Sequence, residues 1–542
     1  MKHITSKLLS LLLCLAMLMS MVPVAYAEVE TEGTDVTEAN GGASEQAAAT
    51  TDAAKVGEAV YTTLAEALAA AKDGDTVTLL ADTKEDVTIE KSITLDLGSK
   101  TLTNTNAGKA TISVTGGTVT VMNGTVTGGT SYYNIGVTKG SNANLTLEGV
   151  TATAGNTGSS MIDNWGTLTI ESGTYTGGLN VVKSEEGSTL TINGGTFSRD
   201  TAPKYGITGV ILVYGDTTII GGEFHNNANT TGSRTIVTGV VEGYTSITKV
   251  TGGNFTSKGG AIFHGLGKAT SDNFEVSGGT FNKSISEGYC ADGFIPTKNA
   301  DGTYGVKEGK YVVKVGSTGY ETFDEAIDAA NKSSNSKTIK LLEDLTVDHQ
   351  IDIKNVKSRA ITLDLGGYTL TNSYDGGGYS LLTRTAVTMK NGTYKSTNGS
   401  ARGIGAVADF TLENAKLSAV GLVGLGCSAP DATYTVKNST VIGNYALANF
   451  VNNAAINIES STITGSGVGI YHNGSNSGLK LTATDSTITA AATGATNGIY
   501  VSGSTSTMTA AGAQQVSLTN CTVSGGTAVE VKYTDLTLTD CT

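Results

Sequence analysis

The chain has 542 residues, of which 71 are glycine and only 4 are proline, and charged residues make up 15%. Its formal net charge is −14, which argues against nucleic acid and anionic membrane as partners, because both require a basic surface.

The first residues predict export. Lys2 and Lys7 precede an apolar run that ends at Val24, and Ala25-Tyr26-Ala27 forms an A-x-A cleavage site. This pattern is typical of a signal peptide over 1–27, and the run is short for a membrane-spanning helix. Removal of the signal takes away two lysines and no acid, so the net charge becomes −16. We therefore expect a secreted or extracellular protein with no membrane partner after signal removal.

Residues 28–55 differ in composition from the rest of the chain. They carry seven acidic residues and one lysine among Ala, Thr and Gly. Such a segment has too few apolar groups to form a core, so it is predicted to be a disordered leader.

A short phrase recurs along the remaining chain. Examples are Ile192-Asn-Gly-Gly-Thr-Phe197 and Val436-Lys-Asn-Ser-Thr-Val441, with a small residue in the fourth place. The small residue returns mostly every 22 to 27 residues, and apolar residues alternate with polar ones around it. A repeat of this length with a two-residue alternation predicts stacked short strands, about 4.8 Å apart, in a parallel β-helix.

The chain also contains an internal duplication. Tyr61–Ala71 matches Tyr320–Ala330, and each segment has the apolar spacing of a short amphipathic helix that would cover the first coil. Each is followed by a strand and by the phrase Ile-Thr-Leu-Asp-Leu-Gly, at Ile93 and at Ile361. We therefore predict two tandem domains, 56–309 and 310–542.

These motifs resemble the right-handed parallel β-helix proteins of the pectate-lyase-like superfamily, especially duplicated modules of Gram-positive surface proteins. The resemblance is carried by the helix with Gly74-Asp75-Thr76-Val77, the two Ile-Thr-Leu-Asp-Leu-Gly phrases, the Gly-Gly-Thr-Phe coils and a closing segment around Tyr289–Val306. It implies an all-β, right-handed solenoid. The resemblance does not indicate a particular activity, because the superfamily includes lyases, hydrolases and adhesins.

The second copy has no counterpart of the closing segment. The chain stops at Asp540-Cys541-Thr542, inside the repeated phrase. An uncapped last coil would leave an open strand edge, so we expect a truncated domain whose missing part holds either the anchor to the cell surface or a catalytic module. The alternative is a natural end protected by dimerisation.

Catalytic motifs are scarce. The sequence has no Asp-Asp pair, no Gly-His-Gly and no Arg-Ile-Lys, which hydrolases of the resembled fold typically show. It also lacks a calcium nonapeptide repeat, His-Glu-x-x-His and Cys-x-x-Cys. We therefore predict no metal and no cofactor, with calcium expected only if the protein is a lyase.

If a catalytic site exists, stacking predicts its place. The residue after the last apolar member of the second strand forms a column in the first domain: Asp163, Lys183, Tyr214, Glu242 and His264. An acid and a histidine on neighbouring rungs could perform acid–base chemistry on a glycan. The alternative is a solvated ladder of mixed charge.

Ligand-binding candidates are mainly aromatic. Tyr471 and Tyr500, followed by Glu530, are predicted on neighbouring rungs, where they would form a flat strip for sugar rings. Stacking that only stabilises the sheet is the alternative. Trp165, Tyr214 and Arg234 are further candidates, Arg234 because it lies in the longest coil of the first domain.

The cysteines suggest one crosslink. Cys521 and Cys541 occupy the small-residue position of adjacent coils, within the Cα distance of a disulfide, so a bridge or a pair of free thiols is expected. Cys290 and Cys427 do not lie in a sequence motif of a nucleophilic cysteine.

Three functions fit these observations. The favoured one is a non-catalytic surface protein that binds glycans or adheres to host or cell-wall surfaces. A polysaccharide lyase or glycoside hydrolase and a rigid spacer are the alternatives.

Overall fold

The computed structural model describes residues 52–542 except 203–205, 473–476, 492, 495 and 504–512. Residues 52–542 form one compact unit. The predicted signal peptide and most of the predicted leader lie outside the described residues, so both remain predictions. The first strand starts at Ala54, two residues before the predicted start of the first domain. In the described part of the chain, no helix has the length and apolar character needed to cross a membrane.

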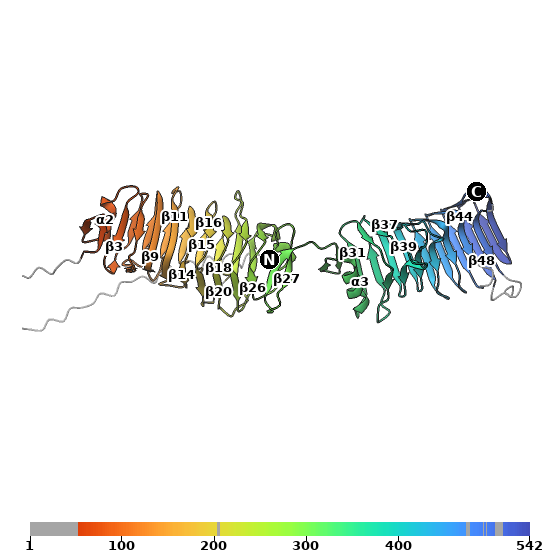
Figure 1. Ribbon diagram of the computed structural model, residues 1–542, viewed down its shortest axis with the longest axis horizontal. Coiled ribbons are helices and arrows are strands. Elements are labelled where there is room, and N and C mark those ends of the chain that lie inside the picture. Colours follow the sequence, from red (N-terminus) through yellow and green to blue (C-terminus); the bar gives the residue numbers. More distant parts are fainter. Residues whose placement is uncertain (1–51, 203–205, 473–476, 492, 495, 504–512) are drawn as a thin grey trace, which may run out of the picture. The chain divides into compact units, whose positions relative to one another are not determined.

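Within the described residues the chain forms three sheets of stacked short strands (Figure 1). The 20-stranded sheet comprises β1 (Ala54–Val56), β2 (Ala59–Tyr61), β3 (Thr76–Leu79), β4 (Thr83–Lys84), β6 (Thr94–Asp96), β7 (Thr101–Thr103), β9 (Thr118–Thr127), β11 (Asn144–Thr153), β13 (Thr167–Ile170), β14 (Gly173–Thr176), β16 (Thr189–Ile192), β17 (Thr196–Arg199), β19 (Asp216–Ile219), β20 (Glu223–Asn226), β22 (Thr248–Val250), β23 (Asn254–Ser257), β25 (Phe274–Val276), β26 (Thr280–Phe281), β27 (Phe294–Lys298) and β28 (Tyr304–Glu308).

The 8-stranded sheet, called the small sheet below, comprises β5 (Val87–Ile89), β8 (Ile112–Val114), β10 (Ile135–Val137), β12 (Ile162–Asn164), β15 (Val182–Ser184), β18 (Thr208–Val213), β21 (Ser233–Val240) and β24 (Phe263–Gly267).

The 23-stranded sheet comprises β29 (Val313–Val315), β30 (Thr318–Tyr320), β31 (Lys337–Leu341), β32 (Leu345–Val347), β33 (Ile351–Ile353), β34 (Ile361–Asp364), β35 (Thr369–Asn372), β36 (Tyr379–Thr383), β37 (Val387–Ser396), β38 (Arg402–Ala406), β39 (Phe410–Ala419), β40 (Val423–Cys427), β41 (Thr433–Lys437), β42 (Thr440–Asn449), β43 (Ala455–Glu459), β44 (Thr462–His472), β45 (Lys480–Thr484), β46 (Thr487–Ala490), β47 (Asn497–Ser502), β48 (Gln514–Thr519), β49 (Thr522–Ser524), β50 (Thr527–Lys532) and β51 (Thr534–Thr539).

Neighbouring coils pair in parallel, so the all-β solenoid is confirmed. Val150 lies opposite Gly124 on one side and Gly173 on the other, as the repeat predicts. Strands β1–β28 pair among themselves, as do β29–β51. The division into two tandem domains stays a prediction.

The repeated phrase places an aromatic ladder in the first core. Tyr175, Phe197, Phe224, Phe255 and Phe281 are fully buried, and their rings stack from coil to coil at centroid distances of 4.7 to 5.3 Å. Each ring is the last residue of the phrase, where the alternation turns it inward. Stacked rings of this kind stabilise the register in addition to their burial.

A serine ladder occupies the small-residue column of the second half. Ser461 Oγ accepts from the amide of Ser439 at 3.1 Å and donates to the carbonyl of Glu459 at 2.7 Å, and Ser486 repeats both bonds one coil further. The preceding residues, Asn438, Ser460 and Asp485, have positive φ. This explains why the phrase requires a turn-forming residue followed by a small one.

Both predicted helices are present. Helix α2 (Leu64–Ala70) and helix α3 (Phe323–Lys332) are capped at their N-termini by Thr63 and Thr322, whose hydroxyls accept from the amides of Glu66 and Glu325. Each helix packs on buried alanines against the first strands. The short antiparallel pairs β1–β2 and β29–β30 that precede the helices were not anticipated. At the predicted closing segment, β27 and β28 form an antiparallel hairpin. Two 3-10 turns, η1 (Ser271–Asn273) and η2 (Glu287–Tyr289), complete the described helical elements.

Candidate functional site

The outward face of the small sheet carries the predicted catalytic column, with two corrections. Asp163 lies opposite Lys183 in adjacent strands, as expected. The next positions, however, are Leu212 and Val237, and His264 follows them. Tyr214 and Glu242 are therefore not members of this column, although Tyr214 lies close by.

The error has a physical reason. In β18 and β21 the outward position holds an apolar residue that is almost completely covered, with 7% exposure for Leu212 and 0% for Val237. Counting from the last apolar residue therefore overshoots the true position. Glu242 lies in the turn after β21, its side chain is 90% exposed, and its carboxylate is 3.5 Å from Lys268 Nζ. His264 is four strands from Asp163, which is about 19 Å at the usual strand spacing, so the two cannot act on the same bond.

Asp163 is the central carboxyl group of this face. Its Oδ2 accepts a hydrogen bond from Trp165 Nε1 at 3.0 Å. Burial and then the nearby negative charge of Glu185 raise the pKa of Asp163 to about 6, although Lys183 and Trp165 favour the ionised form. At neutral pH the group is close to its titration range, which is a property of carboxyls that bind or transfer protons.

Glu185 is the residue that sequence reasoning missed. It is 5% exposed and forms a close ion pair with Lys183. Burial lowers the pKa of Lys183, but the hydrogen bond and charge of Glu185, with the charge of Asp163, outweigh it and raise the pKa. The sequence could have indicated Glu185, because it lies two residues after Lys183 and residues two apart in a strand share a face.

Aromatic side chains lie around the two carboxyl groups of Asp163 and Glu185, which we call the carboxyl pair. By continuation of the register, Trp165, Glu185 and Tyr214 form a second column beside Asp163 and Lys183. Lys183 Nζ lies 5.9 Å from the centroid of the Tyr214 ring. That ring lies against the backbone of Gly239, where an added Cβ would come within 2.3 Å of it.

Three further residues extend the group. Tyr133 lies against Gly136, which is opposite Asp163, and burial raises the pKa of its hydroxyl. Lys139 Nζ sits 3.9 Å from the centroid of Trp165 and 3.3 Å from Glu186 Oε1. The Asp163 cluster is defined by these residues: Tyr133, Lys139, Asp163, Trp165, Lys183, Glu185, Glu186 and Tyr214.

Arg234 lies apart from the Asp163 cluster. It is half-buried on β21, opposite Gly209. Burial and the positive charge of Arg234 lower the pKa of His264. These two residues form a separate basic region further along the small sheet.

The second half presents a different aromatic arrangement. Tyr471, Tyr500 and Glu530 lie on successive strands, as predicted. Tyr445, which was not predicted, stacks on Tyr471 at 5.0 Å and 12°, and Tyr471 stacks on Tyr500 at 5.6 Å and 10°. We call Tyr445, Tyr471 and Tyr500 the tyrosine ladder.

Near-parallel stacking changes what the tyrosine ladder offers to a ligand. Tyr471 has one ring face against Tyr445 and the other against Tyr500, so it presents its edge and hydroxyl to solvent. A sugar stacks on a ring face and not on its edge. The flat strip expected from the sequence is therefore not what the rings form.

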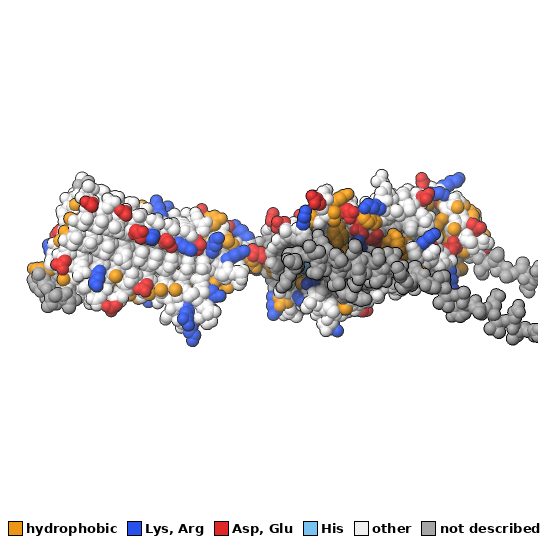
Figure 2. Space-filling view, turned by 180° about the vertical axis from the view of Figure 1, so that it is seen from behind, with side chains coloured by type: hydrophobic (Ala, Val, Ile, Leu, Met, Phe, Trp, Pro, Cys, Tyr) orange, Lys and Arg blue, Asp and Glu red, His pale blue; other side chains and the backbone are white. Residues whose placement is uncertain are grey.

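Charged side chains elsewhere form ordinary cross-strand pairs. Asp364, Lys390, Glu413, Lys437 and Glu459 are opposite one another on successive strands. Figure 2 shows acidic and basic side chains alternating along a line on an otherwise largely uncharged face. Lys437 and Glu459 are 3.1 Å apart and half-exposed, so this charge pattern is a solvated ladder.

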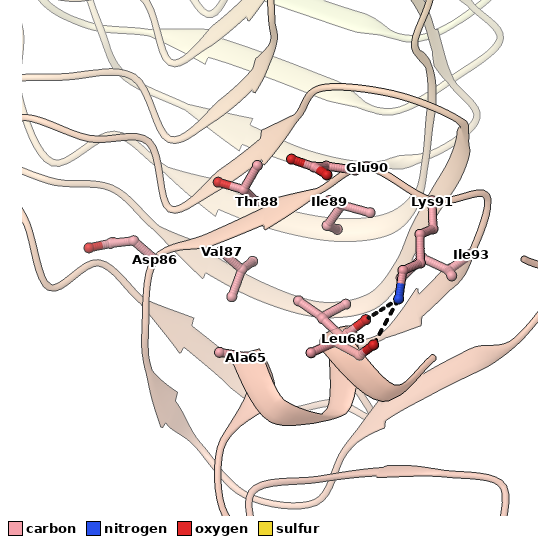
Figure 3. A pocket seen from close by; sticks show the side chains of 10 residues that line it. Ala65, Leu68, Asp86, Val87, Thr88, Ile89, Glu90, Lys91 and Ile93 are labelled. Carbon is pink, nitrogen blue, oxygen red and sulfur yellow. Dashed lines mark hydrogen bonds between the residues drawn. The ribbon is translucent and has the colours of Figure 1, made fainter. Parts of the chain in front are cut away.

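A hollow of about 240 Å³ lies between α2 and β5, away from the Asp163 cluster. Figure 3 shows Lys91 reaching the end of the helix, where Nζ donates to the carbonyl oxygens of Leu68, Ala69 and Ala71. Those carbonyls have no partner within the helix, so Lys91 serves as its C-terminal cap.

Metal and cysteine chemistry is limited. No group of three or more His, Cys, Asp or Glu side chains that could hold a metal occurs within the described ranges. Cys521 and Cys541 are free thiols that donate to the equivalent carbonyls of Thr519 and Thr539. The two thiols are not bridged in this structure, and each is held by the backbone carbonyl two residues before it, so the disulfide stays a prediction.

Comparisons with known proteins give no family. No family model matches the chain, and no curated protein matches it. A solved structure of a variant of the PL6 family alginate lyase AlyGC is similar over 88% of this chain and 98% of that one, with 10% identity and a TM-score of 0.25. The fold assignment rests on the strand register above.

Proposed function

We propose that this is a secreted or cell-surface carbohydrate-binding protein that contacts glycans through the Asp163 cluster. The observation that carries the proposal is the grouping of Trp165 and Tyr214 around the carboxyl pair on one sheet face. Carbohydrate sites combine aromatic surfaces with a few fixed hydrogen-bonding groups. Adhesion to host or cell-wall glycans would use the same contacts.

A glycan chain also suits the shape of this surface. The cluster spans successive strands from β10 to β18, so groups repeat about every 4.8 Å along the solenoid. Neutral or amino sugars suit it better than uronates, since its three acids exceed its two lysines and both lysines are already paired.

Binding is favoured over catalysis by the carboxyl contacts. Glu185 is buried and paired with Lys183, so it is poorly placed to attack a sugar or activate a water. A glycoside hydrolase or lyase is the second candidate, because a carboxyl with a pKa of about 6 can donate a proton near neutral pH.

The test is titration of a glycan panel by calorimetry with the full chain. Tyr214→Ala should weaken glycan binding about twofold to tenfold, because an aromatic contact contributes about 0.5–1.5 kcal/mol beyond its burial. Tyr500→Ala is the matched control and should bind like wild type. Equal affinity of wild type and Tyr214→Ala would overturn the proposal.

The same panel separates the two candidates. We expect no reducing ends after prolonged incubation, with or without calcium. If wild type releases reducing ends and Asp163→Asn does not, the protein is a glycoside hydrolase or lyase and the binding proposal is wrong.

A further inference from the structure

The core of the first half contains a buried cation without a counter-charge. Arg199, at the end of β17, has 0% exposure and is the largest fully buried side chain in the described residues. Burial lowers the pKa of Arg199 to about 10, and no carboxylate contributes to that shift. No ion pair of Arg199 is found among the described residues. An unpaired buried charge is costly, so this arrangement requires an explanation.

The hydrogen bonds of Arg199 are also incomplete. Nη1 donates to Ser233 Oγ at 3.0 Å, and Nε reaches the carbonyl oxygen of Gly178 at 3.4 Å. Nη2 is buried and has no partner. The two N–H groups of Nη2 are therefore unused donors on a permanently charged group.

Two neighbours contribute further unused polar atoms. Ser233 Oγ donates to Asn226 Oδ1 at 2.8 Å, and the Nδ2 of Asn226 is buried without a partner. Asn226 is directly opposite Arg199 in the register of β17 and β20. Thr208, opposite Ser233 in β18 and β21, has a buried hydroxyl without a partner. Three groups able to donate thus surround Ser233.

Among the described residues, no carboxylate is supplied to this position. Asp200 is exposed, and its Oδ1 accepts from Asn227 Nδ2 at 2.7 Å. The undescribed residues 203–205 are Pro-Lys-Tyr, so they contain no acid. Ordered water could satisfy hydrogen bonds here, but it would leave the charge of Arg199 uncompensated.

We propose that Arg199, Asn226 and Thr208 form an internal site for one small monovalent anion of the halide type. The ion would neutralise the guanidinium and accept from Nη2, Asn226 Nδ2 and the Thr208 hydroxyl. It would bind the folded chain and not the unfolded one, so it acts as a structural ligand of the first solenoid.

The test compares thermal unfolding of the full chain in sodium chloride and in sodium gluconate at equal ionic strength. We expect the Tm of wild type to rise with chloride and to saturate at a gain of about 2–4 °C. Arg199→Met, which keeps the apolar stem, should lose the chloride dependence. Arg402→Met removes a partly buried arginine that lies over the Tyr379 ring, and this variant should keep the chloride dependence.

A second measurement covers the case in which Arg199→Met does not fold. Crystals of wild type soaked in bromide should show an anomalous peak within hydrogen-bond distance of Arg199 Nη2. Equal Tm values in chloride and gluconate, a chloride effect that persists in Arg199→Met, or a bromide-soaked crystal without that peak would each overturn the proposal.

Discussion

The Asp163 cluster lies on and beside the strands of the small sheet, and the tyrosine ladder lies on strands of the second half, yet the two expose different surfaces. In the tyrosine ladder neighbouring rings cover one another, whereas the Tyr214 ring in the Asp163 cluster lies against the backbone of Gly239 and near Lys183. We therefore expect an aromatic column in a β-helix to offer ring faces to a ligand only where its rings are not stacked on each other.

The buried aromatic ladder should show the largest loss of unfolding free energy when one stacked ring is removed. Phe224 is fully buried, with Phe197 on one side and Phe255 on the other. Phe224→Ala should lower the free energy of unfolding by about 3–5 kcal/mol, because it removes burial and leaves a cavity. Urea unfolding measures the change, and Phe224→Leu should lose clearly less. A loss below about 1 kcal/mol would mean that this ladder is not tightly packed.

The stacked rings of the tyrosine ladder should also stabilise the fold, but by less than the buried aromatic ladder. Tyr471→Ala removes two stacking contacts and should cost about 1–3 kcal/mol of unfolding free energy. Tyr368→Ala, at an exposed and unstacked position, should cost less than about 0.5 kcal/mol. Chemical unfolding of both variants decides the matter. Equal losses would show that the ladder adds nothing beyond an exposed tyrosine.

The Asp163 cluster should give a pH-dependent stability that the tyrosine ladder lacks. The pKa of Asp163 is about 6 in the folded chain and about 3.9 in a model peptide, so the folded state holds the proton more tightly. Stability therefore falls as pH rises from about 4 through 6, by about 1–2 kcal/mol.

Unfolding midpoints of wild type at pH 4.5 and pH 7 measure this slope, and Asp163→Asn should flatten it. A wild-type slope that the variant keeps would assign the titration to other groups.

The smallest expected change in stability concerns His349, which contacts the cap helix α3 of the second half. Burial lowers the pKa of His349, but its hydrogen bonds to Asp348 and Asp324 outweigh burial and raise it. The protonated ring stabilises the fold below about pH 6.5, and this is lost as pH rises through the folded pKa. Because these groups are exposed, His349→Gln should cost about 0.5 kcal/mol or less at pH 5.5 and nothing at pH 8. A larger loss at pH 8 would contradict this sign.

The sequence was sufficient for the features that depend on period and turn chemistry. Alternation and the small-residue column predicted the register of Gly124, Val150 and Gly173. The apolar spacing in the duplicated segments Tyr61–Ala71 and Tyr320–Ala330 predicted both cap helices.

The site could be predicted only in part, because the remaining features depend on packing. Outward apolar residues at Leu212 and Val237 hid the true strand position of Tyr214 and Glu242. The direction of the Tyr471 ring depends on Tyr445 and Tyr500, which no single repeat reveals. The lack of a counter-charge for Arg199 is visible only once the interior is assembled.

The central claim is that glycans bind at the Asp163 cluster and not on the tyrosine ladder. The chain has a single tryptophan, Trp165, and it belongs to the cluster. Its fluorescence therefore reports on this surface alone. The most direct measurement is a titration of the full chain with a glycan that calorimetry shows to bind. A saturable change in Trp165 emission, kept in Tyr500→Ala and weakened in Tyr214→Ala, is the predicted result. Binding without any change in emission, or binding lost in Tyr500→Ala, would contradict the claim.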